Sequence, residues 1–360
     1  MNQQRASLRN RAIELITQLQ DGGRDDESCR QLIEDIALYQ SRHVTPYKRL
    51  YDARRSETAH PAMPTDVFRY ARVAAHSADE DIRVFTSSGT TESHRSHHYF
   101  RDLGIYAHSA RTAARYALFP DRQRMPLIIL APHEREAPHS SLSYMLSRFE
   151  DWFSLGTASW AWRNDQLEIN ALVHAAKCAR ASREPVALLG TAFAFIHAED
   201  ALKETRFRLP SGSRIMFTGG FKGRSRSVAP DEFRALLSAR YGVRDPWIVG
   251  EYGMTELSSQ LYETTLREVA HGKKPTARRY WVPGWMQASA VNAETLASVA
   301  PGEVGLLRLD DSANLDSCVA IQTSDLGRVD SSGLVVHGRN PDAVPRGCSL
   351  SADMALGGSG

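Results

Sequence analysis

The sequence has few cysteines and no apolar run long enough to cross a bilayer. The four cysteines, Cys29, Cys178, Cys318 and Cys348, are far apart and form no CxxC pair, which argues against both a metal cluster and a disulfide framework. The N-terminal stretch MNQQRASLRNRAIELITQL is polar and amphipathic, unlike a signal peptide. A reduced, cytoplasmic protein that does not bind membranes is therefore expected.

The sequence also lacks an excess of charge. It contains 44 Lys and Arg against 42 Asp and Glu, which gives a formal net charge of +2, and no run of five like charges occurs. A nucleic-acid-binding protein usually carries a basic stripe, so no nucleic-acid partner is predicted. With 42% hydrophobic residues in 360, the chain is long enough to bury a substantial core.

Apolar runs and helical patterns alternate along most of the chain. Apolar spacing predicts two helices within residues 5–41, separated by the polar stretch DGGRDDES. Further helix-like segments cover 102–119 and 231–242, the latter ending at a glycine that suits a helix C-terminus. Short apolar runs that predict buried strands lie at 83–85, 127–130, 186–189, 215–217 and 248–249.

This alternation predicts an α/β fold in which parallel sheets are flanked by helices. After about residue 300 the pattern changes to short strands with Gly, Asp and Ser turns, which predicts a small β-rich subdomain. The expected organisation is an N-terminal helical segment, two α/β subdomains and this β-rich subdomain, at residues 1–75, 76–213, 214–300 and 301–356.

The run SSGTT, Ser87 to Thr91, directly follows the first predicted strand. Small hydroxyl residues around Gly89 offer backbone N–H groups and hydroxyls that can surround phosphate oxygens. No GK[ST] follows, so the run is not a Walker A loop. Taken alone, such a stretch is more often a polar turn that caps the next helix.

Two further motifs follow predicted strands. In GEYGMTE, Tyr252 offers a flat ring for an aromatic base, Thr255 a hydroxyl, and Glu256 a carboxylate of the kind that holds Mg²⁺ beside phosphates. In TSDLGRVD, Asp325 is predicted to lie on a turn and to accept hydrogen bonds from a ribose diol, and Arg339 to approach the same sugar or a phosphate. The alternatives are core packing for the tyrosine and simple turn formation for the aspartate.

The order of these motifs resembles the adenylate-forming superfamily of acyl-CoA synthetases, peptide-synthetase adenylation domains and firefly luciferase. The resemblance covers residues 80 to 350 and includes Ser87-Ser88-Gly89-Thr90-Thr91, Tyr252-Gly253-Met254-Thr255-Glu256, Asp325, and Gly338-Arg339 with Asp342. It implies the large-domain fold of those enzymes without the C-terminal lid. It also implies a ligase that uses ATP and Mg²⁺ to adenylate a small-molecule carboxylic acid.

The resemblance implies a role for each matching residue. Ser87, Ser88, Gly89, Thr90 and Thr91 would hold the β- and γ-phosphates, and Gly219 and Gly220 would line the adenine and acyl pocket. Tyr252, followed by Gly253, would stack on adenine. Thr255 would contact the α-phosphate and Glu256 would bind Mg²⁺, so both are expected to be catalytic. Asp325 and Arg339 would hold the ribose hydroxyls.

Two departures from the superfamily pattern stand out. Glu92 occupies the place of the second glycine of the phosphate loop, and a carboxylate beside a triphosphate is unfavourable unless a cation such as Arg95 neutralises it. Pro345 stands where a lysine is expected after G-R-x-x-D, and the chain ends soon afterwards. These departures predict weak ATP binding, and either slow adenylation or completion of the site by a partner protein.

More narrowly, FTSSGTT, TGGFKGR and RGCSL resemble a short branch of the superfamily. It contains the acyl-protein synthetases of bacterial luminescence and an adenylating protein of phenazine-antibiotic biosynthesis. Cys348 resembles the acyl-accepting cysteine of the luminescence proteins, and a nearby Arg346 would lower the pKa of its thiol. The alternative is a buried structural cysteine.

The expected function is activation of a carboxylic acid as an acyl-adenylate for transfer to a thiol, a carrier or another partner. An aromatic acid such as a phenazine carboxylate is slightly favoured over a fatty acid because the region 149–162 is rich in aromatic residues. One alternative is an acyl-protein synthetase that loads a fatty acyl group on Cys348. The other is a non-catalytic relic of the same fold that binds acyl groups or nucleotides.

Overall fold

The computed structural model describes residues 3–88, 95–219, 229–339 and 346–357, and these form two compact units. Unit 1 comprises residues 1–113, 254–260 and 281–360, and unit 2 comprises 114–253 and 261–280. Each unit is assembled from parts of the chain that are distant in the sequence. The limits of the units therefore do not coincide with those of the four predicted segments. That four-part organisation remains a prediction.

Unit 2 contains the predicted parallel sheet. Strands β4 (Leu127–Leu130), β8 (Ala187–Thr191), β9 (Arg214–Thr218) and β10 (Ile248–Tyr252) pair in parallel in that order. Strand β5 (Ser159–Trp160) pairs in parallel with β4, and β11 (Leu261–Glu263) adds an antiparallel edge to β10. The central strands are almost continuously buried, as expected for a sheet that is covered on both faces.

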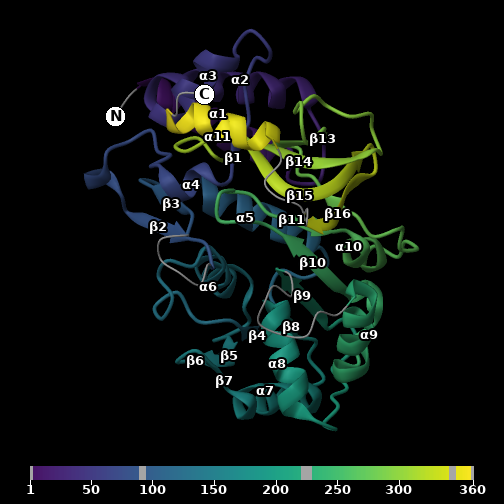
Figure 1. Cartoon of the computed structure of the whole chain (residues 1–360). Helices are drawn as coiled ribbons and strands as arrows, with labels where there is room; N and C mark the ends of the chain where they lie inside the picture. The colour runs from purple at the N-terminus through teal and green to yellow at the C-terminus, as the bar shows by residue number, and fades with distance from the viewer. Residues whose placement is uncertain (1–2, 89–94, 220–228, 340–345, 358–360) are drawn as a thin grey trace. The chain divides into compact units, whose positions relative to one another are not determined.

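Helices cover this sheet, and α8 and α9 run alongside β8 to β10 in Figure 1. They are α6 (Ser141–Phe153), α7 (Ile169–Ser182), α8 (Ala192–Leu202), α9 (Pro230–Tyr241) and α10 (Thr265–Ala270), with the 3₁₀ turn η3 (Asp245–Trp247) and the hairpin β6–β7 (Trp162–Arg163, Gln166–Leu167). As predicted, α9 ends at a glycine, since Gly242 adopts a φ of +70° at the C-cap. Much of the aromatic region is core, because Phe149 and Phe153 are fully buried.

Unit 1 combines the N-terminal helices with the β-rich part of the chain. The predicted helix pair is α1 (Gln3–Gln18) and α2 (Asp26–His43), and α3 (Thr45–Arg54) packs against α2. The antiparallel sheet runs in the order β13 (Met286–Val291), β14 (Val304–Asp311), β15 (Ala320–Asp330), β16 (Gly333–Arg339), and the short β1 (Met63–Pro64) pairs in parallel with β15. The β-rich C-terminal part is therefore confirmed.

The remaining elements of unit 1 are short, apart from the helices α5 (Gly104–Ala117) and α11 (Arg346–Leu356). The short ones are α4 (Val67–Tyr70), η1 (Ala78–Glu80) and the hairpin β2–β3 (Arg83–Thr86, His97–Phe100). Helix α5 and strand β12 (Tyr280–Trp281) carry the chain between the units. In Figure 1, α11 lies along α3, so the C-terminal helix packs on the N-terminal part of the same unit.

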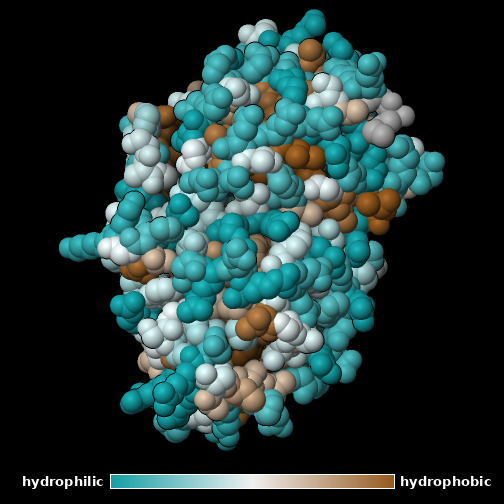
Figure 2. Space-filling model, turned by 180° about the vertical axis from the view of Figure 1, so that it is seen from behind, coloured by the Kyte–Doolittle hydropathy of each residue, from teal (hydrophilic) through white to brown (hydrophobic). Residues whose placement is uncertain are grey.

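Contrary to expectation, the predicted strand at 83–85 does not join the parallel sheet. The run at 83–85 is β2, which pairs antiparallel with β3 in a separate two-stranded sheet instead of joining the parallel sheet. The physical reason is local packing, because Phe85 and Phe100 are diagonal neighbours on the two strands, and their ring centroids are 5.2 Å apart. The surface in Figure 2 is mostly hydrophilic with scattered apolar residues, as is usual for a globular protein.

Candidate functional site

The hydroxyl run begins at the end of the β2–β3 hairpin. The Ser87 amide donates a hydrogen bond to the Ser96 carbonyl at 3.0 Å, and the Ser96 amide donates to Ser87 Oγ, also at 3.0 Å. These bonds fix the two ends of the intervening loop close together. Ser88 is the last described residue before that loop, and the predicted phosphate-binding residues Gly89, Thr90 and Thr91 lie outside the described residues, as does Glu92.

The second half of the YGMTE motif lies against this hairpin within unit 1. His98 Nδ1 donates a hydrogen bond to the Thr255 carbonyl at 2.8 Å, and the Ser96 side chain hydrogen-bonds the Glu256 carboxylate. Segments almost 160 residues apart in the chain are thereby joined. The base of the predicted phosphate loop and the predicted metal-binding carboxylate consequently belong to one cluster.

The Glu256 carboxylate is only 6% exposed. Burial raises its pKa above the ordinary glutamate value, because the charged form loses its hydration. The hydrogen bond from Ser96 and the charges of Arg69 and Arg339 oppose this increase without cancelling it. The site therefore holds a carboxylate whose charged form a bound cation would stabilise.

The predicted ribose-binding pair also lies in unit 1. Asp325 and Arg339 are direct partners in the antiparallel register of β15 and β16, and Arg339 Nε is 3.7 Å from Asp325 Oδ1. The prediction that Asp325 lies on a turn is wrong, because the residue is inside β15, where the sheet holds it in extended conformation. Since Arg339 also acts electrostatically on Glu256, this pair belongs to the same cluster as Thr255 and Glu256.

The residues predicted to contact the adenine and to line the acyl pocket belong to unit 2. Thr218 and Glu251 are partners in the parallel register of β9 and β10, so Gly219 follows β9 beside Tyr252, the last residue of β10. The ring of Tyr252 lies 5.8 Å from that of Tyr280. Gly220 lies outside the described residues.

The chain passes from unit 2 to unit 1 between Gly253 and Met254, inside the YGMTE motif. Tyr252 and Gly253 therefore belong to one unit, whereas Thr255 and Glu256 belong to the other. The structure thus divides these predicted site residues into two clusters, one in each unit.

Several supporting residues have no counterpart in the sequence motifs. Asn314 Nδ2 donates a hydrogen bond to the Glu256 carbonyl at 2.8 Å, and Gln40 Nε2 donates to the Asn314 carbonyl at 2.7 Å. His98 holds the neighbouring Thr255 carbonyl in the same way. The sequence pattern could have indicated Gln40, because its spacing continues the helical stripe of Ile33, Ile36 and Ala37 on α2. In the structure Gln40 is fully buried, as these three residues are.

Cys348 lies on α11 and packs with Val291 and Leu306 in a small hydrophobic cluster. It is 5% exposed, and burial, followed by the negative charge of Asp66, raises the pKa of its thiol to about 11. The expectation of a lowered pKa is therefore wrong, because the thiolate would lose its hydration and would lie near the negative charge of Asp66. In this arrangement the thiol is a protonated, buried group.

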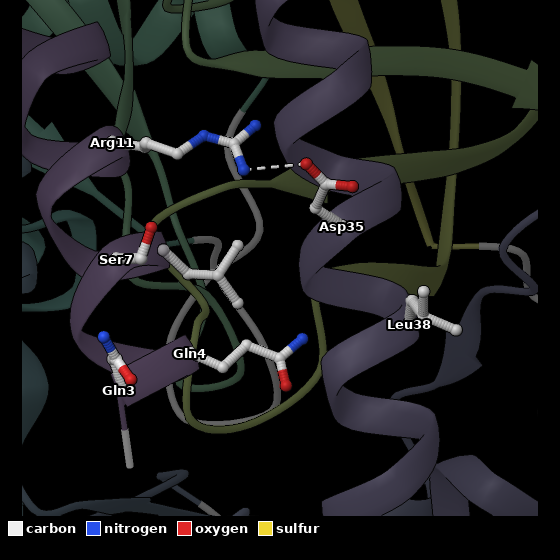
Figure 3. A pocket seen from close by; sticks show the side chains of 7 residues that line it. Gln3, Gln4, Ser7, Arg11, Asp35 and Leu38 are labelled. Carbon is white, nitrogen blue, oxygen red and sulfur yellow. Dashed lines mark hydrogen bonds and ion pairs between the residues drawn. The ribbon is translucent and has the colours of Figure 1, made fainter. Parts of the chain in front are cut away.

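Other features of the described residues do not add to the site. A shallow groove between α1 and α2 contains none of the predicted residues, and its Arg11 is paired with Asp35 at 2.7 Å (Figure 3). Among the described residues, no group of three or more His, Cys, Asp or Glu side chains is arranged to hold a metal ion. The described helices include none with the length and apolar character needed to cross a bilayer.

His98 provides a testable pH dependence. Burial of the His98 ring lowers its pKa from 6.5 to about 4. Between these two pH values the ring is neutral in the folded protein but protonated in the unfolded chain. Stability is therefore lost as the pH falls from about 6.5 towards 4. From these two pKa values we expect His98 to reduce the free energy of unfolding by about 2 kcal/mol between pH 7 and pH 5.

Chemical unfolding at the two pH values, for the wild type and His98→Asn, measures this contribution. The asparagine amide can still donate to the Thr255 carbonyl but does not titrate, so the variant should lose less stability than the wild type over the interval. Equal losses in the two proteins would contradict the assignment.

Known proteins support the resemblance that the motifs indicate. A profile of the acyl-protein synthetase family LuxE matches residues 49–356, which is most of the chain. The chain belongs to this family. It is 26% identical over 291 residues to the long-chain-fatty-acid–luciferin-component ligase of Aliivibrio fischeri, covering 79% of this chain and 71% of that protein. For the ligase of the same name from Vibrio harveyi, the identity is 24% over 313 residues, with 82% and 78% covered.

Solved structures support the fold. An open conformation of 2-hydroxyisobutyryl-CoA ligase with 2-HIB-AMP and CoA matches with a TM-score of 0.62 and 13% identity, covering 90% of this chain and 77% of that one. The same ligase in its thioesterification state gives 0.61 and 15%, with 89% and 65% covered. The predicted adenylate-forming fold, the relationship to the luminescence synthetases and the assignment as a ligase are thus confirmed. None of these proteins is named for a phenazine carboxylate.

Proposed function

We propose that the protein joins a carboxylic acid to ATP, forming an acyl-adenylate and pyrophosphate, and then passes the acyl group to a thiol. The observation that carries this proposal is the cluster in unit 1, where Thr255 and Glu256 lie beside the base of the hydroxyl loop and the pair Asp325–Arg339. A cluster with these groups can bind the phosphates and the sugar of one nucleotide.

The proposed roles follow the chemistry of each group. Ser87 and Ser88, with the loop that follows them, would donate to the β- and γ-phosphates. The Thr255 hydroxyl would donate to the α-phosphate, and Asp325 and Arg339 would bind the ribose hydroxyls. For unit 2 by itself, Tyr252 is proposed as a ring on which an aromatic base stacks, and Gly219 and Gly253 would allow the base to approach the backbone.

Glu256 fits a magnesium ligand. Mg²⁺ in nucleotide sites is commonly held by one or two carboxylates, while substrate phosphates and water supply the other oxygens. A single carboxylate is therefore sufficient, and the raised pKa of Glu256 shows that its charged form lacks full stabilisation. When bound, the ion would neutralise charge on the substrate phosphates.

The reaction brings two anions together, because the acid's carboxylate oxygen attacks the α-phosphorus of ATP while the bond to the pyrophosphate oxygen breaks. Hydrogen-bond donors aimed at the α-phosphate lower the cost of the charge that develops there. We propose this role for the Thr255 hydroxyl, and the hydrogen bond from His98 to the Thr255 carbonyl would restrain the backbone that carries it. The neutral His98 ring adds no charge of its own, since its pKa is lowered to about 4 by burial.

Two classes of acid have specific support. The family membership and the two luciferin-component ligases favour a long-chain fatty acid. A group of partly exposed aromatic residues in unit 2 favours a flat aromatic acid, because Trp162 lies 6.2 Å from Phe193, which in turn lies 4.8 Å from His197. A phenazine carboxylate belongs to the second class and has no further support.

The proposal is tested by ATP–pyrophosphate exchange with a panel of long-chain fatty acids and aromatic acids. We expect exchange that depends on both the acid and Mg²⁺, fastest for one of the two classes. Calorimetry with ATP and Mg²⁺ provides an independent binding readout. A protein that binds ATP but exchanges with no acid would be a non-catalytic relic of the fold, and the proposed function would be wrong.

The role of Cys348 in the transfer step gives a separate prediction. If this thiol accepts the acyl group, Cys348→Ser should abolish retention of radiolabelled acyl group on the protein while acid-dependent pyrophosphate exchange continues. The thiol is buried, so the transfer also requires α11 to move away from Val291 and Leu306. Cys178→Ser, at an exposed cysteine, is the matched control and should retain the label. Labelling of Cys348→Ser at the wild-type level would place the acceptor elsewhere.

A further inference from the structure

A row of three polar side chains lies at the carboxyl ends of neighbouring strands in unit 2. Thr191 ends β8, Thr218 ends β9, and Glu251 is the penultimate residue of β10. The parallel register pairs Thr191 with Thr218 and Thr218 with Glu251, so the three side chains point to the same face of the sheet. Ligands of open α/β sheets bind at this edge, and the motifs described above give none of the three a role.

Glu251 is the unusual member of the row. It is 7% exposed on an otherwise apolar strand, and Thr218 Oγ1 donates a hydrogen bond to its carboxyl group. The neighbouring guanidinium groups of Arg234 and Arg278 are both engaged by another carboxylate, that of Glu263. Among the described residues of unit 2, no basic side chain forms an ion pair with Glu251.

A carboxylate can accept up to about four hydrogen bonds, and within the described part of unit 2 the hydroxyl of Thr218 fills only one of these places. Burying such a group without further partners is costly, and burial raises the pKa of Glu251 to about 7. A polar group on a ligand would supply the missing hydrogen bonds.

The backbone leaves room for a ligand on one side of the carboxyl group, at Gly219. Gly219, next to Thr218, has a φ of +76°, and a Cβ atom built there meets no described atom within 4 Å. At Gly253, by contrast, a Cβ would clash with the Glu251 carboxyl group, so this glycine allows the carboxyl group to lie against the chain directly after Tyr252. Glu251 consequently lies among the residues of unit 2 that are proposed to bind the nucleotide and the acid.

We propose that Glu251, supported by Thr218, selects acids that carry a hydrogen-bond donor, either a hydroxyl or an amino group, in addition to the carboxylate that is activated. This inference rests on the proposed function and deepens it, because it names a property of the substrate. A plain alkyl or aryl acid would leave the buried carboxyl group without its additional partner. A donor-bearing acid would provide that partner.

Discrimination of this kind is strong in enzymes. A site that hydrogen-bonds a substrate hydroxyl or amine can reject the analogue without that group by about 10⁴-fold, whereas one methylene more or less changes the rate by about 10- to 200-fold. The expected preference for a donor-bearing acid is therefore larger than a change in chain length can produce.

The test compares matched acids in the exchange assay with the full chain. The pairs are octanoic and 8-hydroxyoctanoic acid, dodecanoic and 12-hydroxydodecanoic acid, and benzoic acid with its 4-hydroxy and 4-amino derivatives. The readout is the ratio of kcat/KM within each pair, which does not depend on the fraction of active protein. For the wild type we expect the donor-bearing member of at least one pair to be preferred by more than about 200-fold, beyond what one methylene can produce.

Glu251→Gln keeps the size of the side chain but removes its charge and half of its acceptor capacity, so the preference should fall by at least about tenfold. Glu251→Asp keeps the charge but withdraws it by one methylene, and should reduce the preference less. Glu184→Gln, at an exposed glutamate of the same unit, is the matched control and should keep the wild-type ratio.

Three results would overturn the inference. A wild type that does not prefer the donor-bearing acid in any pair would do so, as would a ratio that both Glu251 variants leave unchanged. Absence of exchange with every acid would overturn the proposed function and this inference with it. The first two outcomes, in which exchange is observed, leave the proposed function intact.

Discussion

Replacing Glu256 by glutamine is expected to reduce the rate of acid-dependent pyrophosphate exchange by about 10²- to 10³-fold, which is the typical effect of removing one group that stabilises the charge developing in a transition state. Glutamine has nearly the same shape and can still accept a hydrogen bond from Ser96, so the variant removes the charge specifically. The loss should appear in kcat and in the Mg²⁺ concentration required for half-maximal exchange. Steady-state exchange over a range of Mg²⁺ concentrations measures both.

The same substitution should not destabilise the protein. Burial raises the pKa of Glu256 in the folded state above its value in the unfolded chain. At a pH above the raised pKa, ionisation of Glu256 therefore lowers the stability of the folded state, whereas below the unfolded-state pKa it does not affect stability. Near neutral pH the glutamine variant should therefore be as stable as the wild type or more so. Loss of exchange with an unchanged or higher melting temperature fits a functional carboxylate, whereas full exchange activity in Glu256→Gln would contradict its assignment.

Replacing Asp325 by alanine is expected to raise KM for ATP by about 10- to 100-fold. A hydrogen bond to a charged acceptor contributes about 1.5–3 kcal/mol, and each 1.4 kcal/mol corresponds to about tenfold in affinity. The contact with the ribose is the same before and during the reaction, so the effect should fall mainly on KM. Exchange kinetics at varied ATP concentrations measure it.

A matched control for Asp325 is available on the same strand. Asp330→Ala removes a carboxylate at the other end of β15, which accepts hydrogen bonds from Ser332, and should leave KM for ATP near its wild-type value. Removing Asp325 also breaks its ion pair with Arg339, but that pair is partly exposed and contributes little to stability. An unchanged KM in Asp325→Ala would contradict ribose binding by this residue.

Much of the fold could be predicted from the sequence because its signals are local. The apolar runs of β4, β8, β9 and β10 are short and continuous, as strands of a covered parallel sheet should be, and all four pair as expected. The partner of β2 could not be predicted in this way. A four-residue apolar run is compatible with several partners, and the choice depended on the contact between Phe85 and Phe100 across a loop.

The candidate site was predictable where residue types follow one another in a motif. Thr255, Glu256, Asp325 and Arg339 came from such motifs, and the structure brings these four together in unit 1. The electrostatic state of a group was not predictable, as Cys348 shows, because a pKa depends on burial by residues distant in the chain.

Supporting residues such as Asn314 belong to no motif, since their contribution is a hydrogen bond to a backbone carbonyl. Such a hydrogen bond requires no particular residues next to the donor in the sequence, so no motif marks it. Glu251 was visible within GEYGMTE, but its single hydroxyl partner, Thr218, lies 33 positions away. Only the pairing of β9 and β10 brings the two together.

The central claim, that the acid's oxygen attacks the α-phosphorus of ATP, is tested most directly with an acid labelled with ¹⁸O in its carboxyl group. After turnover with ATP and Mg²⁺ and transfer of the acyl group to a thiol, mass spectrometry of the nucleotide product reports where the label resides. The proposed reaction predicts one ¹⁸O atom in AMP and none in pyrophosphate. Label in inorganic phosphate with ADP as the product, or no transfer of label to any phosphorus, would contradict it.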